Sequence, residues 1–340
     1  MTSPPSPSPS TTIGSWEAEN VSVGEVEGAL SGLRRHEQRA AVRTSVLTLA
    51  AVVHSREGAD IVRSTVHDLG LRHPSRTVVV VMGGDEVETG STGIDAAVWV
   101  HALMNSAGRA VCFEEVVLTV RGPAKFHLDS VVGPFALPDV PLVVWLPASL
   151  PAPGDPLLDV ADRLVVDSRA VAEGGADALA RSSVLCRRLP VSDLSWIRLR
   201  PWRTQLAGLF EGGATRPFLD AVDMVEVAGN AGPRLMMGGW LLRRLRLPAA
   251  RVRLSPAEHV SVSVEAMFEG HRGRFSVSRL GRERSITASV DIDGGPTLEQ
   301  VLRMEDRWPA LALAGALTTV GHDEAYEDAL AGARTLRDAA

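Results

Sequence analysis

The strongest constraint on the fold is a pair of nearly continuous apolar runs separated by one helix-length segment. RTSVLTLAAVVH (43–54) and RTVVVVM (76–82) are rich in β-branched residues, as are strands buried on both faces. Between them, EGADIVRSTVHDLGLR (57–72) has the character of a helix, and Pro74 favours its end because it holds His73 extended. This order predicts a βαβ unit with parallel strands.

The segments around this unit extend the same pattern. The apolar spacing predicts helices at 23–38, 124–133, 156–163 and 170–182, and strands at 95–103, 110–122, 141–147 and 164–168. We therefore expect an α/β domain with a mostly parallel sheet over residues 21–190. The Ser/Pro-rich start, MTSPPSPSPSTT, cannot bury apolar area, so we expect a disordered tail over residues 1–20.

The pattern changes after about residue 190. Segments 259–269, 272–280 and 282–292 alternate polar with apolar residues, which is typical of an antiparallel sheet with one wet face. We also expect the segment 218–229 to end in a strand, and helices at 232–247, 297–306 and 323–338. Residues 191–340 are thus predicted to form a smaller α+β domain with an antiparallel sheet.

Charge is unevenly distributed along the chain. The net charge is −6, yet the stretch from Arg181 to Arg284 holds 18 arginines and nine acidic residues, so it carries +9 and the remainder −15. The only lysine is Lys125, which indicates a compositional bias towards arginine. An acidic chain overall gives no general attraction to nucleic acid or to an anionic membrane.

Cysteine content and hydropathy indicate the compartment. Cys112 and Cys186 are the only cysteines and form no CxxC pair, which argues against a disulfide scaffold or a cysteine zinc site. The N-terminal segment lacks the basic and apolar regions of a secretion signal, and the apolar runs are too short to span a bilayer. We expect a soluble cytoplasmic protein.

The sequence has no catalytic constellation. The G-x-G-x-x-G, Walker A, H-E-x-x-H and G-x-S-x-G patterns are absent. The glycine-rich stretch MGGDEVETGSTG (82–93) carries three acidic residues and no lysine, so it is expected to be a loop without a phosphate ligand. We therefore predict no catalytic residue, no cofactor and no metal, and a protein that is not an enzyme.

Isolated polar residues have structural explanations beside functional ones. Ser168 or Asp167 follows a strand end where ligands often bind, but either is also a good N-cap for the next helix. Glu114 and Glu115 are adjacent in a strand, so they point to opposite faces and cannot form an acid/base pair. Arg76 could face a ligand at a strand entrance or simply pack there.

The stretch VSDLSWIRLRPWR (191–203) combines two tryptophans with three arginines. Asp193 is expected to cap a helix that Pro201 divides near Arg200. The aromatic and basic side chains could pack within the protein, bind a protein partner, or stack and neutralise nucleic acid. The partner-binding candidates are Trp196, Arg198, Arg200, Trp202 and Arg203.

The segment DLSWIRLRPWRTQLAGLF resembles the DLxWxRxxPWR motif of the OpcA family, the glucose-6-phosphate dehydrogenase assembly proteins. The likeness runs in order through RTSVLTLAAVV, HPSRTVVVV, CFEEVVLTVRG, LPDVPLVVWLP and ADRLVVDSR, and into MMGGWLLRRLRL. The residues that match its motifs are Pro138, Asp139, Pro141, Trp145, Asp193, Trp196, Arg198, Pro201, Trp202 and Arg203.

The resemblance implies a non-catalytic partner that binds glucose-6-phosphate dehydrogenase in the oxidative pentose phosphate pathway and promotes its assembly or activity. The alternatives are a sugar-phosphate-binding sensor or enzyme acting on its own, which the arginine-rich middle third favours, and a nucleic-acid binder, which the overall acidity disfavours. The chain departs from the family in having Trp145-Leu146 where a second tryptophan is common. It also has no cysteine after Cys186, which argues against a thiol switch there.

Overall fold

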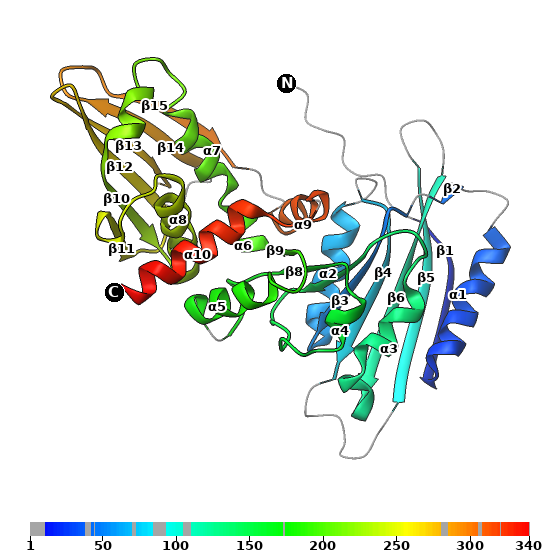
Figure 1. Cartoon of the computed structure of the whole chain (residues 1–340). Helices are drawn as coiled ribbons and strands as arrows, with labels where there is room; N and C mark the ends of the chain where they lie inside the picture. The colour runs from blue at the N-terminus through cyan, green and yellow to red at the C-terminus, as the bar shows by residue number, and fades with distance from the viewer. Residues whose placement is uncertain are drawn as a thin grey trace. The chain divides into compact units, whose positions relative to one another are not determined.

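The structure is a computed structural model, and it describes residues 11–37, 42–43, 45–69, 73–83, 93–104, 110–172, 174–279, 285–304, 308–319 and 321–339. The chain divides into two compact units (Figure 1). Unit 1 contains Met1–Val166 and Pro309–Thr318, and unit 2 contains Asp167–Trp308 and Thr319–Ala340. The sequence analysis placed the domain boundary later, at about residue 190.

Unit 1 is built on one mostly parallel sheet, as predicted. Its strands lie in the order β1-β5-β6-β4-β3-β7-β8, with the short β2 also beside β6. Their bounds are β1 Thr11–Val21, β2 Val42–Arg43, β3 Leu47–Val53, β4 Ser75–Met82, β5 Gly93–Met104, β6 Ala110–Arg121, β7 Leu142–Leu146 and β8 Arg163–Val166. Only the pairs β1–β5 and β5–β6 run antiparallel among the described strands of this unit.

The predicted βαβ unit forms the centre of this sheet. Strands β3 and β4 pair in parallel, and the helix α2 (Arg56–Leu69) connects them. All seven residues of β3 are buried, and the valines of β4 at 78–81 are at most 3% exposed. Because burying one such side chain contributes about 1.5–3 kcal/mol, this double burial favours the central position of both strands.

The prediction of a disordered tail over residues 1–20 is wrong for its second half. Residues Thr11–Val21 form the strand β1, which pairs with β5; residues 1–10 lie outside the described part of the chain. The side chains of β1 are mostly exposed, so the segment has no apolar pattern of its own. It is held by backbone pairing with β5, which sequence composition does not reveal.

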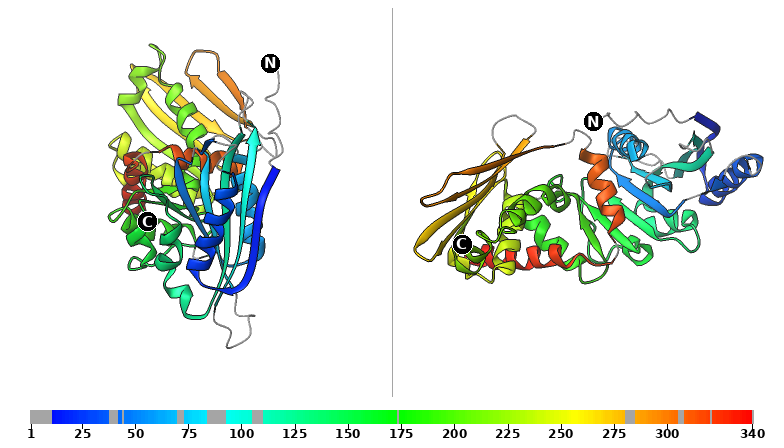
Figure 2. Two further views of the ribbon diagram at one scale, coloured as in Figure 1. Left: turned by 90° about the vertical axis from the view of Figure 1, so that its right-hand side faces the viewer. Right: turned by 90° about the horizontal axis from the view of Figure 1, so that it is seen from above.

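Helices cover both faces of the sheet in unit 1 (Figure 2). The adjacent residues Glu114 and Glu115 of β6 contact α1 (Val23–Glu37) and α2 respectively. Since neighbouring residues of a strand point to opposite faces, α1 and α2 lie on opposite sides of the sheet. The predicted helix at 124–133 is present as a 3-10 turn followed by α3 (Leu128–Val132), and the one at 156–163 is the short α4 (Leu157–Val160).

The helix α9 (Trp308–Thr318) adds a late segment of the chain to unit 1. Ala312, Leu313 and Ala316 of this helix are completely buried. Arg163, at the start of β8, donates from Nη1 to the carbonyl oxygen of Ala316 at 3.0 Å. A guanidinium that binds a carbonyl in the last turn is favourably placed for the helix dipole.

Unit 2 contains a six-stranded sheet in the order β11-β10-β12-β13-β14-β15. Its bounds are β10 Val222–Gly229, β11 Val252–Pro256, β12 Ser261–Phe268, β13 His271–Ser278, β14 Ser285–Ile292 and β15 Leu298–Arg303. The pair β10–β11 is parallel and the other pairs are antiparallel, so the predicted antiparallel sheet is confirmed.

The helix predicted at 297–306 is wrong, because Leu298–Arg303 form the strand β15. Leucine, glutamate, glutamine and arginine all favour helices, so the local composition misleads. Pairing with β14 over six residues decides the outcome instead.

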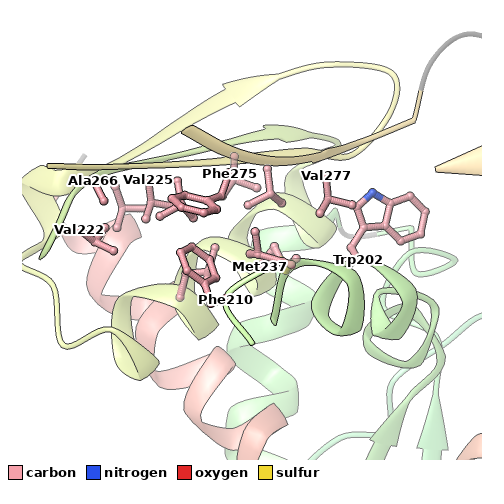
Figure 3. Close-up of a cluster of buried hydrophobic side chains, with 14 of the residues drawn as sticks. Trp202, Phe210, Val222, Val225, Met237, Ala266, Phe275 and Val277 are labelled. Carbon is pink, nitrogen blue, oxygen red and sulfur yellow. The ribbon is translucent and has the colours of Figure 1, made fainter. Parts of the chain in front are cut away.

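The helices of unit 2 include α5 (Gly175–Leu185), α7 (Arg200–Gly208), α8 (Ala231–Arg244) and α10 (Glu324–Asp338). Figure 3 shows how side chains from α7 and α8 meet one face of the sheet. Trp202, Met237 and Phe275 are 6%, 0% and 0% exposed there. The opposite face carries serines and charged residues, as the alternation predicts.

The helices α8 and α10 cross at a pair of glycines. An ideal Cβ on Gly239 would lie 2.3 Å from the carbonyl oxygen of Ala329, and one on Gly332 would lie 2.1 Å from the carbonyl oxygen of Gly239. These contacts are with backbone atoms, which cannot move aside as a flexible side chain could. The MMGGW segment therefore contains glycine where two helix backbones touch.

Candidate functional site

The segment that follows β9 (Val191–Asp193) forms two short helices, as predicted. The helix α6 (Leu194–Arg198) ends at Leu199, and α7 follows with Pro201 in its first turn. Proline lacks the N–H that an uninterrupted helix would need, so it divides the segment, yet it fits the first turn of α7. Asp193 is the N-cap of α6, which confirms that part of the sequence analysis.

The carboxylate of Asp193 joins three parts of unit 2. Its Oδ1 accepts from the backbone N–H groups of Ser195 at 2.8 Å and Ser168 at 3.1 Å. Its Oδ2 accepts from the hydroxyl of Tyr326, on α10, at 3.0 Å. Asp193 is completely buried, and this burial raises its pKa, while the bonds from Ser168 and Ser195 oppose the rise. The group is therefore a structural bond acceptor, closed to solvent.

A second carboxylate, Asp167, fixes α6 from the other side. Arg198 donates to both of its oxygens, from Nη1 at 2.8 Å and from Nη2 at 2.6 Å. Ser195 donates its hydroxyl to Asp167 at 2.7 Å and accepts from the N–H of Arg169 at 3.0 Å. Such a bidentate, charge-assisted pair is the strong form of this interaction and holds α6 in place.

Neither Asp167 nor Ser168 caps the following helix, so that prediction is wrong. The helix α5 begins at Gly175 and its N-cap is Gly174. Residues 168–170 form a turn, and Ser168 is 1% exposed. Asp167 instead binds residues 28 and 31 positions later, Ser195 and Arg198.

Trp196 contacts an arginine through its ring face and an aspartate through its indole N–H. Its ring is 1% exposed, and its Nε1 donates to Oδ2 of Asp323 at 3.0 Å. The guanidinium carbon of Arg203 lies 3.6 Å from the ring centroid, a cation–π contact. Burial lowers the pKa of Arg203 to about 10, and the nearby Asp323 opposes that change. Asp323 also caps α10 by accepting from the N–H of Tyr326 at 3.0 Å.

The five partner-binding candidates differ in exposure. Trp196 and Trp202 are buried at 1% and 6% exposure, and Trp202 donates from Nε1 to the carbonyl oxygen of Val260 at 3.2 Å. Arg198 and Arg203 are half-buried in the contacts just described, whereas Arg200 is exposed. Burial of both tryptophans favours the packing alternative for them, and their partner-binding role stays a prediction.

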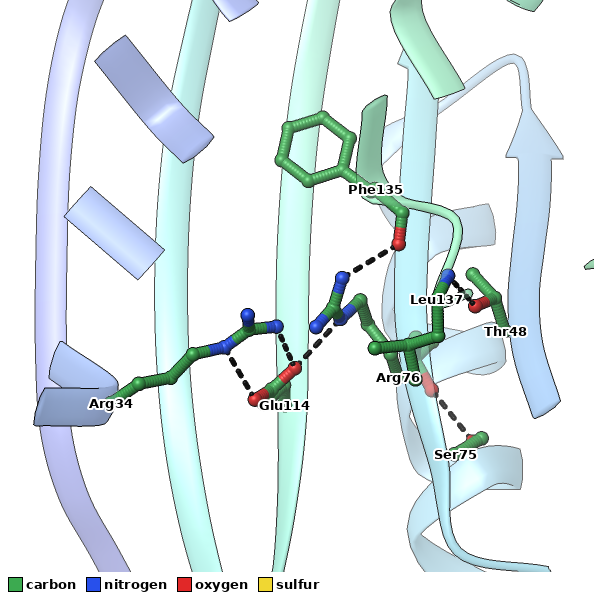
Figure 4. A network of polar contacts seen from close by, with 8 residues as sticks. Arg34, Thr48, Ser75, Arg76, Glu114, Phe135 and Leu137 are labelled. Carbon is green, nitrogen blue, oxygen red and sulfur yellow. Dashed lines mark hydrogen bonds and ion pairs between the residues drawn. The ribbon is translucent and has the colours of Figure 1, made fainter. Parts of the chain in front are cut away.

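A separate polar network lies in unit 1 (Figure 4). Arg34 of α1 donates to both oxygens of Glu114 at 2.7 Å, and Arg76 of β4 donates from Nε to the same carboxylate at 2.7 Å. Arg76 also donates from Nη1 to the carbonyl oxygen of Phe135 at 2.8 Å. Its Nη2 is buried and has no hydrogen-bond partner among the described residues. Arg76 thus packs at the strand entrance and ties β4 to β6.

The neighbouring Glu115 serves the opposite face of the sheet, as predicted from strand geometry. It forms an ion pair with Arg63 of α2, and its Oε2 lies 3.3 Å from Nε2 of His101 of β5. Burial acts to raise the pKa of Glu115, but the bonds from His101 and Arg63 outweigh it and lower the pKa. Two adjacent glutamates therefore anchor one helix on each face.

The described residues offer no cluster of three or more His, Cys, Asp or Glu side chains that could hold a metal ion. Within the same part of the chain, no helix combines the length and hydropathy needed to cross a membrane. Most of the glycine-rich stretch 82–93 lies outside the described residues.

The sequence analysis missed Asp323 and Tyr326, which complete the network around Asp193. The only signal that could have marked Asp323 is its N-cap position before a helical run.

We expect the thiol of Cys186 to be inert in the folded protein. The residue is 8% exposed, and burial raises the pKa of its thiol to about 12 from the ordinary value of 9.0. Since the thiolate is the reactive form, Cys112→Ser protein should react with a chromogenic disulfide reagent at pH 8 only after unfolding. Because the folded pKa is raised, this group's contribution to stability is constant below pH 9 and falls between pH 9 and about 12. Prompt labelling of the folded chain at pH 8 would contradict this assignment.

Comparison with known families assigns the architecture. Residues 66–183 match the family model described as "Glucose-6-phosphate dehydrogenase subunit N-terminal domain", and residues 189–330 match the corresponding C-terminal domain. The chain belongs to the OpcA family. Its DLSWIRLRPWR motif lies at the start of the second match, and the contacts above show that the motif's Asp193, Trp196 and Arg198 hold α6 within unit 2.

Two OpcA proteins of cyanobacteria are similar to this chain. The OxPP cycle protein OpcA of Synechocystis sp. is 29% identical over 142 residues, which are 40% of this chain and 30% of that protein. The OxPP cycle protein OpcA of Nostoc punctiforme is 25% identical over 189 residues, which are 52% of this chain and 39% of that protein. The matches therefore span less than half the length of either relative.

Proposed function

We propose that this protein is a non-catalytic cytoplasmic partner that binds a glucose-6-phosphate dehydrogenase and promotes its assembly or activity. The observation that supports this most is the ordered match of both family domains, over 66–183 and 189–330. The buried polar groups are consistent with it. Inside unit 2, Ser195 donates its hydroxyl to Asp167, and Asp193 accepts from the N–H of Ser168 and from the hydroxyl of Tyr326. These bonds hold helices in place.

Such a partner raises the rate only through differential binding. It must bind the active form of the dehydrogenase more tightly than the inactive form, since equal affinity for both would shift no population. A tenfold preference corresponds to about 1.4 kcal/mol, which a few well-placed contacts can supply.

The test is a binding and rate experiment with the dehydrogenase of the same organism. The purified chain is immobilised and the dehydrogenase is passed over it, while the rate of the dehydrogenase is measured with increasing amounts of the chain. We expect a complex and a saturable change in rate or in substrate KM. Absence of both at micromolar concentrations would contradict the proposal.

Within the predicted partner-binding set, Arg200 is the residue whose exposed side chain can reach a partner directly. The structure gives it no hydrogen bond or ion pair with any described residue. We expect Arg200→Glu to weaken the complex roughly tenfold or more, because arginine is common at interface hot spots and the change reverses its charge. The Tm of the variant should stay within about 1 °C, since an exposed charge contributes little to stability.

The matched control for this variant is Arg272→Glu, another exposed arginine, at the β12–β13 hairpin of unit 2. It makes the same change in net charge at another position. Equal losses of affinity in both variants would indicate general electrostatic attraction and not a contact at Arg200.

One observation favours a second candidate function, the sensing of a sugar phosphate. In unit 1 two guanidinium groups, of Arg34 and Arg76, share the single carboxylate of Glu114, and the buried Nη2 of Arg76 has no hydrogen-bond partner among the described residues. Arginines with free donors suit phosphate oxygens. Calorimetry with glucose 6-phosphate and the chain alone tests this: saturable heat at low millimolar ligand that is lost in Arg34→Gln protein would support it, and no heat would discard it.

A further inference from the structure

The strand β15 (Leu298–Arg303) is an exposed edge. It is the last strand of the sheet in unit 2, paired with β14 on one side, and no other described strand pairs with its outer side. All six of its residues are exposed, including Leu298 at 63%, Val301 at 65% and Leu302 at 36%. A strand edge with free backbone groups is a template for pairing with another strand, and proteins rarely leave one uncovered.

The register with β14 assigns each side chain of β15 to a face. Glu299, Val301 and Arg303 lie opposite Ser289, Thr287 and Ser285, which belong to the partly exposed polar face of the sheet. Leu298 and Leu302 lie opposite Val290 and Ile286, which point into the core.

The order Glu299, Val301, Arg303 is complementary to itself in one arrangement. If two copies of β15 run antiparallel about a two-fold axis at Val301, the two Val301 side chains face each other. Each Glu299 then lies directly opposite the Arg303 of the other copy. Because the axis repeats every contact, this arrangement forms two opposite-charge pairs on either side of an apolar pair. Neither Glu299 nor Arg303 has an ion-pair partner among the described residues.

The core-facing side of β15 is consistent with the same register. Gln300 lies opposite Leu302 of the second copy, and Leu298 lies opposite Met304, whose side chain is already partly buried against the core of unit 2. The apolar surface of one copy therefore meets apolar or neutral side chains of the other, and no like charges face each other across the pair.

We propose that β15 pairs with β15 of a second copy of this chain, so that the two unit 2 sheets join into one continuous sheet around a two-fold axis at Val301. The pairing covers the edge of each sheet and the exposed side chains beside it. Since one strand pair buries less surface than a standard stable interface, the dimer is reversible and depends on concentration.

The test uses single and mixed charge reversals in the full chain, followed by sedimentation velocity from 1 to 100 µM. In Glu299→Arg protein, two arginines face two arginines across the axis, and in Arg303→Glu protein, two glutamates face two glutamates. We expect each single variant to raise the dimer Kd by roughly tenfold or more. An equimolar mixture of the two variants restores both opposite-charge pairs and should form a heterodimer with a Kd near that of the original chain.

The matched control is Glu211→Arg, an exposed glutamate elsewhere in unit 2, which changes the net charge equally and should leave the Kd unchanged. Circular dichroism confirms that each variant is folded. Val301→Lys, which puts two like charges on the axis, should also dissociate the dimer.

A chain that remains monomeric throughout the range overturns the proposal, and so does a dimer that the single reversals leave intact. A third outcome would also overturn it: a monomer whose binding to the dehydrogenase is lost in Glu299→Arg would show that the partner enzyme covers this edge. The mixed-variant rescue distinguishes this proposal from a failure of the proposed function, because it needs no dehydrogenase.

Discussion

Replacing Gly332 by alanine is expected to lower the free energy of unfolding of unit 2 by about 3 kcal/mol, because the new methyl group has no space. Its Cβ would lie 2.1 Å from the carbonyl oxygen and 2.6 Å from the Cα of Gly239 on the facing helix. Both atoms belong to the backbone of α8, so the helices α8 and α10 would have to move apart. Urea denaturation followed by circular dichroism measures the loss.

The matched control is Gly208→Ala in α7 of the same unit. A Cβ on Gly208 would meet no atom within 4 Å, and Gly208 is exposed. Alanine is favoured over glycine within helices by about 0.5–1 kcal/mol, so this variant should be unchanged or slightly more stable. If Gly332→Ala were equally well tolerated, the close approach of the two helices would be disproved.

The second large effect is expected for Asp193→Ala. The change leaves the N–H groups of Ser168 and Ser195 and the hydroxyl of Tyr326 without their acceptor in a fully buried position. A buried donor without a partner costs about 1–3 kcal/mol, while removal of the buried carboxylate recovers part of that cost. We expect a net loss of about 3 kcal/mol in the free energy of unfolding, measured by urea denaturation.

Tyr326→Phe separates the contributions to this effect. It removes one donor to Asp193 and keeps the two backbone donors and the aromatic packing against Trp196, so we expect a loss of only about 1–2 kcal/mol. Equal losses in the two variants would mean that the backbone donors find another acceptor. The cap and the tyrosine would then not act together.

Elements with a strong apolar period could be predicted from the sequence, and elements held only by pairing could not. The buried strands β3 and β4 could be predicted from continuous runs of valine, leucine and alanine. β12, β13 and β14 could be predicted from the alternation of polar and apolar residues. β1 and β15 have exposed side chains, so neither carries a burial pattern. β1 is held by backbone bonds to β5, which is distant in the sequence. β15 is held by backbone bonds to β14, although its own residues favour a helix.

The site was predictable where its contacts are local. The cap by Asp193 and the break at Pro201 depend on residues within one or two turns, and both are confirmed. The bonds from Asp193 to Tyr326 and from Trp196 to Asp323 join residues 133 and 127 positions apart. No single-sequence pattern encodes such a distance, so the burial of Trp196 and Trp202 could be recognised only after the fold was known.

The late position of α9 governs how this molecule can mature on the ribosome. Residues 309–318 complete unit 1, and their last turn supplies the carbonyl of Ala316 to Arg163. Nascent unit 1 therefore lacks its last helix until the whole sheet of unit 2 has been translated. A fragment cut between the two family matches would be missing this helix permanently.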